Sequence, residues 1–473
     1  MLFNSLTFVV FFAIVLALHY TPLLSWRTKK ILLLIESFIF YAAWNPPFVV
    51  LLWISTALDW VVARRIAASD HVGTRRGWLA VSLLGNLGIL GYFKYGSFLL
   101  ENWIAAMQAI GIEWQAPAWD IILPVGISFY TFQTMAYSLD VYLRRSEPAD
   151  SLLDFSLFVT FFPQLVAGPI VRPADLIPQF AAPPPRLPGQ LSWGLALMVL
   201  GLFEKVVIAD GALSPAADAV FAHPASLHWT DAWLGTLAFS GQIFCDFAGY
   251  STTAIGAALA LGFGLPANFR YPYAAIGFSD FWRRWHISLS TWLRDYLYVP
   301  LGGNRKGAPR TYVNLMVTML LGGLWHGASW TFVVWGGLHG AYLAIERFLQ
   351  RRFPSHAVSR TLLFQAGLAL LTFFLVNLTW VFFRARDFAT AQRMIGSMLT
   401  FADGPKVLTA AQATIALVPV IGILVVHWVM RNRSVEDVAG QAPRWLSATV
   451  IGAMLFALVI SQGSSNAFIY FQF

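Results

Sequence analysis

Long apolar segments follow one another along almost the whole chain, with only short polar connections between them. Crossing the hydrocarbon core of a bilayer takes about 20 apolar residues as a helix. Within lipid every backbone N–H and C=O needs a partner in the protein, which leaves helices and closed barrels. Barrel strands alternate apolar and polar residues over about ten positions, whereas these segments are apolar throughout. The sequence therefore predicts an all-α, polytopic membrane protein with about 11 or 12 transmembrane helices.

We expect one membrane domain over residues 1–473, because neither a soluble domain nor an internal repeat is evident. Some predicted spans are short for a full crossing, so interfacial and re-entrant helices are expected around an intramembrane cavity. The predicted spans cover residues 4–22, 31–44, 48–63, 78–98, 121–143, 191–209, 231–262, 311–325, 329–346, 361–383, 408–430 and 445–462.

The composition excludes a soluble protein. Charged residues make up 11% of the chain and hydrophobic residues 58%, whereas a soluble domain carries about 25% charged residues. The net charge of +8 comes from basic residues in short clusters between apolar segments, a pattern typical of membrane orientation. We therefore expect these basic residues to interact with a lipid bilayer and not with nucleic acid. A single cysteine, Cys245, excludes an intramolecular disulfide and a cysteine-built zinc site.

The basic clusters also predict an orientation. Five of them fall on one side if the spans alternate, and that side is expected to be the cytoplasm. They are Arg27–Lys30, Arg64–Arg76, Arg144 with Arg145, Arg347–Arg360 and Arg431–Arg444. Four basic residues disagree with this topology, because it places them outside: Arg384, Arg386, Arg393 and Lys406.

Polar residues are costly inside lipid and usually face a cavity or each other, and they are densest between Gln242 and His339. Asp246 lies inside an apolar run, where it either serves a site or pins a neighbouring helix. The residues from Ser279 onward predict one amphipathic helix with Ser279 as its N-cap. His286 falls on the apolar side of that helix and therefore points inward. A hydrogen-bonded core histidine, without a role in a site, would lie in the same place.

The glycine-rich stretch Gly322–Ser329 predicts a break between two helices. It places His326 beside a cavity within the membrane, where an imidazole is suited to proton transfer near neutral pH. The alternative is a structural histidine at a helix turn. His339 lies beyond the break, and spacing alone does not bring it into the same site. No metal site is expected, because no histidine or carboxylate pair has the close helical spacing of such sites.

Several long motifs, in the same order along most of the chain, resemble those of the membrane-bound O-acyltransferase (MBOAT) family. The resemblance is greatest to the branch with the alginate O-acetyltransferase membrane subunit. The motifs are Phe161–Arg172, Gln242–Ser251, Phe278–Arg305, Gly323–Gly327 and Phe468–Phe473.

The resemblance implies that His326 is the catalytic histidine and His286 the second polar residue of the family's pair. Moving an acyl group from a thioester to a hydroxyl requires removal of the hydroxyl proton, which a neutral imidazole can accept. On this basis His326 is the expected general base, and His286 orients a substrate or polarises the thioester carbonyl. Five residues of the motifs are candidate substrate contacts, with lipid anchoring as the alternative for the arginines: Asp246, Arg283, Arg284, Trp325 and Asn304.

The resemblance further implies a multi-pass protein of a bacterial inner membrane that acetylates an exported polysaccharide. Its donor would be acetyl-CoA or another acyl thioester, with no bound cofactor, and periplasmic acetyl-transfer proteins would be its partners. Two alternatives remain open. One is a D-alanyl transferase of teichoic acid synthesis, which has the same core, and the other is a polysaccharide or lipid transporter.

Overall fold

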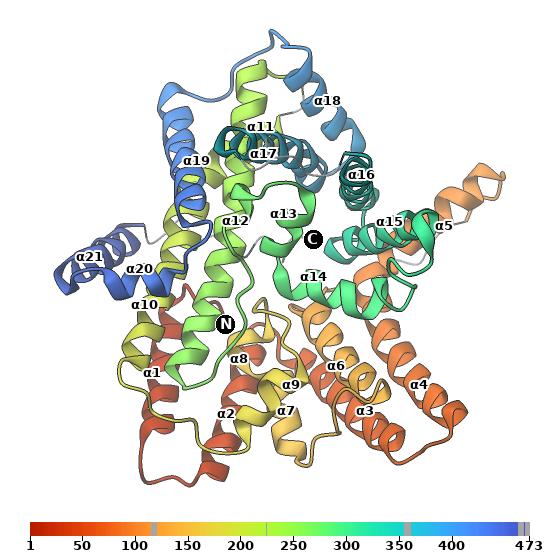
Figure 1. Ribbon diagram of the computed structural model, residues 1–473, viewed down its shortest axis with the longest axis vertical. Coiled ribbons are helices and arrows are strands. Elements are labelled where there is room, and N and C mark those ends of the chain that lie inside the picture. The colour runs from red at the N-terminus through yellow and green to blue at the C-terminus, as the bar shows by residue number, and fades with distance from the viewer. Residues whose placement is uncertain (115–120, 224, 354–360, 462–467, 469–473) are drawn as a thin grey trace. The chain divides into compact units, whose positions relative to one another are not determined.

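A computed structural model describes residues 1–114, 121–223, 225–353, 361–461 and 468. Over these residues the chain forms helices joined by turns and loops, without a strand (Figure 1). The predicted all-α class is therefore confirmed. The chain divides into two compact units, unit 1 with Met1–Leu195 and Ala254–Pro266, and unit 2 with Ala196–Thr253 and Ala267–Phe473. The single domain over residues 1–473 stays a prediction.

Unit 1 holds most of the helices of the first 195 residues. They are α1 (Leu6–Tyr20), α2 (Trp26–Ala42), η1 (Pro46–Phe48), α3 (Val49–Ala67), α4 (Val72–Leu90), η2 (Gly91–Tyr95), α5 (Gly96–Ala109), α6 (Ile127–Tyr142), α7 (Leu152–Thr160), α8 (Phe162–Leu165), α9 (Pro173–Leu176) and η3 (Ile177–Phe180). Two helices contribute residues to both units, namely α10 (Gln190–Leu202) and α12 (Trp229–Ala260).

The remaining elements belong to unit 2. They are η4 (Phe203–Leu213), α11 (Ser214–Ala222), η5 (Pro272–Ala274), α13 (Phe278–Arg284), α14 (Ile287–Leu293), η6 (Arg294–Tyr298), α15 (Gly307–His326), α16 (Trp330–Arg352), α17 (Leu362–Arg384), α18 (Phe388–Leu399), α19 (Ala410–Met430), α20 (Val435–Gln441) and α21 (Arg444–Ile460).

Five helical stretches of the described residues are long and apolar enough to cross a membrane. They are Pro46–Ala67, Gln190–Ala222, Trp229–Ala260, Leu362–Arg384 and Ala410–Met430. The apolar helices α1 and α21 are shorter. Large apolar side chains on α1, α17 and α21 are exposed, among them Leu6, Leu363 and Phe456, as lipid-facing side chains are. The chain is a multi-pass membrane protein, and the count of about 11 or 12 spans stays a prediction.

In unit 1 a buried carboxylate ties three helices together. Asp59 on α3 is fully buried and accepts hydrogen bonds from Ser82 and Asn86 on α4 and from Ser138 on α6 (2.5 to 2.6 Å). These three helices lie side by side in Figure 1. Because burial of an unpaired carboxylate is costly, the three donors are what allows Asp59 to lie inside this helix group.

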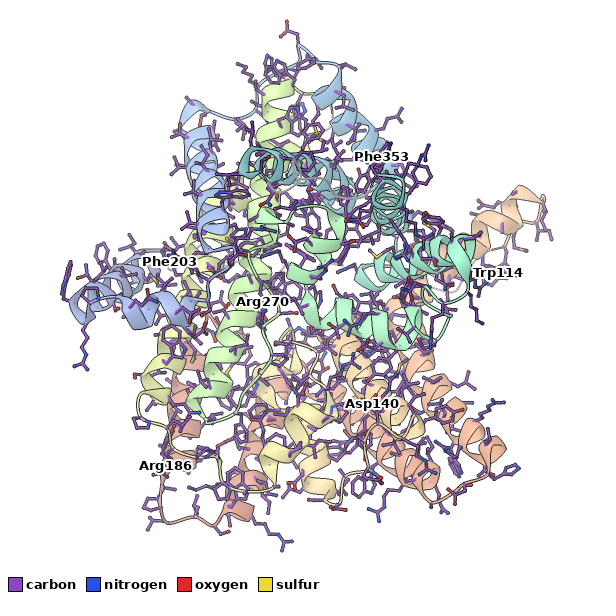
Figure 2. All side chains as sticks on the ribbon, in the orientation of Figure 1. Trp114, Asp140, Arg186, Phe203, Arg270 and Phe353 are labelled. Atoms are coloured by element: carbon purple, nitrogen blue, oxygen red, sulfur yellow. The ribbon has the colours of Figure 1, made fainter. Side chains whose placement is uncertain are left out.

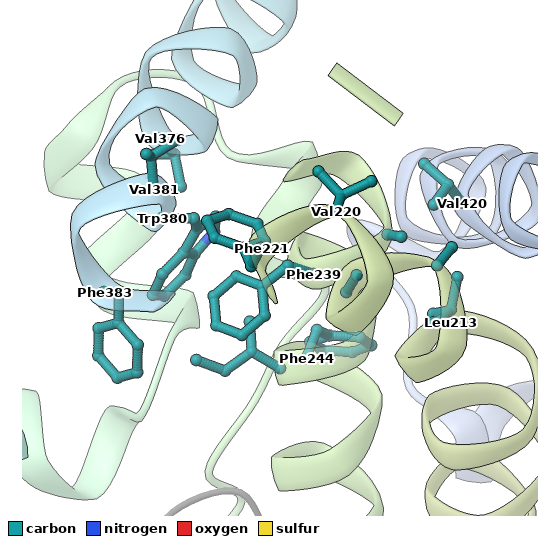
Figure 3. Packing of buried hydrophobic residues seen from close by; sticks show 14 of the residues in the cluster. Leu213, Val220, Phe221, Phe239, Phe244, Val376, Trp380, Val381, Phe383 and Val420 are labelled. Carbon is teal, nitrogen blue, oxygen red and sulfur yellow. The ribbon is translucent and has the colours of Figure 1, made fainter. Parts of the chain in front are cut away.

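The core of unit 2 is built on α12. Side chains of η4, α11, α17 and α19 pack with those of α12 in one apolar cluster (Figure 3). Among its members, Phe239 on α12 and Trp380 on α17 are fully buried, and their ring centroids lie 6.4 Å apart. This cluster continues to Phe281 and Trp285, and so connects the core to the segment that carries His286.

Arg384 accounts for part of the disagreement in the predicted topology. Its guanidinium donates to the Asp218 carboxylate at 2.6 Å and lies over the rings of Phe221 and Phe239. Asp218 lies between the predicted spans 191–209 and 231–262, in a segment that the predicted topology places outside together with Arg384. Because the carboxylate neutralises the guanidinium there, this arginine departs from the orientation rule without an unpaired charge.

Candidate active site

The structure brings His286 and His326 together inside unit 2. Their ring centroids lie 6.3 Å apart, with the ring planes at 61°. Both side chains are buried, at 0% and 1% exposure. His286 lies at the junction of α13 and α14, and His326 is the last residue of α15. The tertiary fold therefore pairs two histidines that are 40 positions apart in the chain.

The predicted single helix from Ser279 is wrong, because the chain breaks at His286. The first part, α13, ends at Arg284, and α14 begins at Ile287 in a different direction (Figure 1). The backbone φ of His286 is +43°, in the left-handed region that residues other than glycine rarely occupy. Such strained positions persist where surrounding contacts enforce them, and they cluster at functional sites.

Two backbone hydrogen bonds enforce this break. The N–H of Ile287 donates to the carbonyl of Asn268, and the N–H of Arg270 donates to the carbonyl of Arg284, both at 2.9 Å. The loop around Arg270, labelled in Figure 2, thus runs beside the junction of the two helices. It satisfies backbone groups that a continuous helix would have satisfied internally. A helical sequence pattern does not reveal this competing partner.

Aromatic rings and one amide surround His286. The Phe247 ring meets the imidazole edge to face at 4.6 Å, and Phe468 packs on Phe247 at 5.7 Å. The imidazole Nδ1 lies 3.2 Å from Asn268 Oδ1. Burial lowers the pKa of His286 to about 3, so its ring is neutral at physiological pH. Apart from Phe468, the predicted terminal motif lies outside the described residues.

The predicted break at Gly322–Ser329 is confirmed, because α15 ends at His326 and α16 begins at Trp330. Gly327 is extended, and Ser329 caps α16 by accepting from the N–H of Thr331. The two helices pack closely through glycines, since a Cβ added to Gly323 would lie 3.1 Å from the Cα of Gly336. This contact holds the end of α15, and so His326, against the start of α16.

Three aromatic side chains enclose His326. Its ring centroid lies 5.0 Å from Trp325, 5.0 Å from Trp335 and 5.3 Å from Phe383. Trp325 also lies 5.6 Å from His286. Of the five candidate substrate contacts, Trp325 is the one that touches both histidines. The walls around the pair are therefore mainly aromatic, and the low polarity strengthens electrostatic interactions inside the site.

His339 belongs to the same aromatic cluster but has a different role. Its ring lies 4.7 Å from Trp335 and 5.2 Å from Trp282. The Thr379 hydroxyl gives its proton to the Val376 carbonyl at 2.7 Å, so it accepts from His339 Nε2 at 3.0 Å. His339 is thus a hydrogen-bonded core histidine that joins α16 to α17.

The structure places Asp246 in a buried ion pair. Its carboxylate contacts the ammonium of Lys205 on η4, and Lys205 also donates to Asp210 at 2.8 Å. All three side chains are at most 7% exposed. Sequence reasoning missed Lys205 and Asp210 as partners, although a lysine within the apolar range 191–209 was a signal. Asp246 therefore joins α12 to the π-helical segment η4.

None of the remaining candidate substrate contacts has a described contact with the histidine pair. Arg284 donates to Asp280 at 2.9 Å and to the carbonyl of Arg431 at 3.0 Å, while Arg431 also pairs with Asp280 at 2.8 Å. Arg284 is thus engaged in joining α13 to the end of α19. Arg283 and Asn304 are exposed, and no described contact brings either of them to the histidines.

Glu346 on α16 is a site residue that sequence reasoning did not single out. Its Oε2 accepts from the N–H groups of Phe278 (2.6 Å) and Ser279 (3.0 Å) at the start of α13. Gly277, at φ +86°, allows this approach, since a Cβ there would lie 3.2 Å from the carboxylate. The predicted cap at Ser279 is wrong, because Gly277 occupies the N-cap position and a distant carboxylate supplies the acceptor.

We expect Glu346→Ala to destabilise the protein by about 1–2 kcal/mol, as the loss of a helix cap does. The effect should lower both the unfolding temperature and the fraction of active protein, because α13 leads into His286. Glu346→Gln keeps an acceptor oxygen and is expected to lose less. Thermal unfolding of the detergent-purified protein measures both. Equal unfolding temperatures for Glu346→Ala and the unsubstituted protein would contradict the capping role.

The described residues form an all-helical fold with two buried histidines, each at the end of a helix, and comparison with known proteins identifies the class of membrane protein. Residues 149–384 match the model of the membrane-bound O-acyltransferase family. The probable alginate O-acetylase AlgI of Pseudomonas putida is 43% identical over 407 residues, covering 85% of this chain and 81% of the relative. The chain therefore belongs to the membrane-bound O-acyltransferase family and is an O-acyltransferase.

Two further relatives differ in their named activities. The peptidoglycan O-acetyltransferase of Helicobacter pylori is 38% identical, over 84% of this chain and 80% of its own. The teichoic acid D-alanyltransferase of Bacillus subtilis is 29% identical, over 50% of this chain and 62% of its own. The similarity to the O-acetylating relatives is thus both greater and more extensive.

Proposed function

We propose that this protein transfers an acetyl group from a cytoplasmic acyl thioester, such as acetyl-CoA, to hydroxyls of an exported polysaccharide. The observation that carries the proposal is the pair of buried imidazoles, His286 and His326, at 6.3 Å within aromatic walls. It is supported by relatives named as alginate O-acetylase and peptidoglycan O-acetyltransferase. The setting we propose is a bacterial inner membrane.

His326 acts as the general base in this proposal. The hydroxyl oxygen attacks the thioester carbonyl carbon, the new C–O bond forms, and the C–S bond breaks. The hydroxyl proton passes to His326 and from there to the thiolate that leaves. The same residue can instead serve the formation of an acyl intermediate. The apolar enclosure excludes water, which would otherwise compete as the nucleophile.

Periplasmic proteins are the partners we propose. A donor made in the cytoplasm and a polymer outside the membrane can meet only at a site within the bilayer. The histidine pair is buried in such a multi-pass bundle. Proteins on the far side of the membrane would then carry the acetyl group to the polymer or present the polymer to the site.

Mass spectrometry of the host's exported polymers, from a strain that lacks the gene, tests this function. We expect the mass increment of one acetyl group to disappear from one polymer while its export continues. Expression of the unsubstituted protein should restore the acetyl group. Loss of export with acetylation retained would instead indicate a transporter, and loss of D-alanine from teichoic acid would indicate the D-alanyl transferase. Either result would overturn the proposal.

A further inference from the structure

The side chain of Asn268 has a defined orientation. Its Oδ1 lies 3.2 Å from the backbone nitrogen of Ser288 and 2.9 Å from the Ser288 hydroxyl. A backbone N–H can only donate, so the amide atom that faces it must be the oxygen and not the nitrogen. Asn268 is 1% exposed and Ser288 8%. Burial of both partners keeps water from replacing this contact.

This orientation determines the tautomer of His286. The imidazole Nδ1 lies 3.2 Å from the same Asn268 oxygen. An amide oxygen carries no proton, so Nδ1 must donate to it. A neutral imidazole has one N–H, which leaves Nε2 with a lone pair and no proton. The hydrogen bond to Asn268 therefore makes the far side of His286 a hydrogen-bond acceptor.

Two roles were expected of His286, to orient a substrate or to polarise the thioester carbonyl. As a hydrogen-bond acceptor, Nε2 cannot perform the second. Stabilising the negative charge that develops on a thioester carbonyl requires a hydrogen-bond donor. In the tautomer that Asn268 selects, Nε2 can instead receive a hydrogen bond from a hydroxyl. His326 takes the proton of the attacking hydroxyl in the proposed function, so the proton directed at His286 comes from another hydroxyl. A sugar ring carries several.

We propose that Asn268 is a positioning residue that holds His286 as the Nδ1–H tautomer, so that Nε2 accepts a hydrogen bond from a second hydroxyl of the acceptor sugar. The inference rests on the proposed function and deepens it, because it gives His286 the task of binding the acceptor. It implies an acceptor with more than one hydroxyl at the site. Binding of the acyl thioester does not depend on this hydrogen bond.

Three variants separate positioning from folding. Asn268→Leu has a similar volume and removes the acceptor oxygen. Asn268→Asp keeps an oxygen at that place and should rescue the function. Ser288→Ala is the matched control. It removes the hydroxyl that donates to Asn268 Oδ1 but keeps the backbone N–H that orients Asn268.

The first readout is acetyl transfer to an oligosaccharide of the polymer identified above, with purified protein in lipid nanodiscs. For Asn268→Leu we expect about a tenfold rise in the acceptor KM, which corresponds to the loss of one good hydrogen bond. The donor KM and the kcat should stay unchanged, as when an interaction common to the ground state and the transition state is lost. Ser288→Ala and Asn268→Asp should stay near the unsubstituted protein. A fall in kcat at unchanged acceptor KM would overturn the assignment.

The second readout needs no activity. Solid-state NMR of protein with ¹⁵N-labelled histidine distinguishes an Nδ1–H from an Nε2–H imidazole. The signal that disappears in His286→Asn identifies His286, and asparagine tolerates the left-handed backbone there. We expect an Nδ1–H signal in the unsubstituted protein and in Ser288→Ala, and its loss in Asn268→Leu. An Nε2–H signal for His286 in the unsubstituted protein would refute the inference. Acetyl groups retained on every exported polymer of the strain that lacks the gene would instead refute the proposed function.

Discussion

Replacement of His326 by alanine is expected to reduce acetyl transfer by about 10²–10⁴-fold, the contribution of a positioned general base. The imidazole ends α15, is 1% exposed and is enclosed by Trp325, Trp335 and Phe383. The other imidazole of the pair, His286, has its ring centroid 6.3 Å away, and burial lowers its pKa to about 3. Loss of the imidazole therefore removes the proton acceptor, while the helix break at Gly327 is retained.

The measurement is acetylation of the acceptor in membranes that hold equal amounts of protein. His339→Gln is the matched control, because His339 is an equally buried histidine of the same aromatic cluster that serves α16 and α17 packing. We expect the control to retain most of its activity. Full acetylation by His326→Ala, at normal protein levels, would show that another residue takes the proton.

The second large effect concerns stability. Lys205→Met should destabilise the protein by about 3–5 kcal/mol, because it leaves the buried carboxylates of Asp246 and Asp210 without their cation. We expect little protein in the membrane and a lower unfolding temperature of what remains. Removing one partner of a buried ion pair costs more than removing the whole pair, since a lone charge keeps its desolvation penalty.

A triple variant provides the control for this effect. Lys205→Met combined with Asp210→Asn and Asp246→Asn removes all three charges and should recover most of the lost stability. If Asp246 serves only to join α12 to η4, the recovered protein should also be active. A stable but inactive triple variant would assign Asp246 to the substrate. A Lys205→Met protein as stable as the original would contradict the ion pair itself.

The sequence predicted the features that depend on local pattern and on solvent. Apolar runs of spanning length require helices in lipid, so the all-α multi-pass class followed from hydropathy alone. The break after His326 was also predictable, because its glycines permit both a turn and the close contact of Gly323 with Gly336. Both predictions rest on properties of neighbouring residues in the chain.

The helix from Ser279 shows where local pattern fails. Its residues have helical spacing, and yet the chain leaves the helix at His286 because the loop at Asn268 offers hydrogen bonds from 18 positions away. Glu346 likewise caps α13 from 67 positions away, and this carboxylate replaces the predicted cap at Ser279. Partners so distant in sequence leave no periodic signal.

The sequence by itself determined that this protein lies in a membrane as helices and that its few buried polar residues need partners. The tertiary structure alone decided which of those residues meet. It paired His286 with His326, matched Lys205 to Asp246 and turned Asn268 toward Nδ1 of His286. The physical reason is that burying a polar group is costly without a partner, while the identity of that partner depends on which helices pack together.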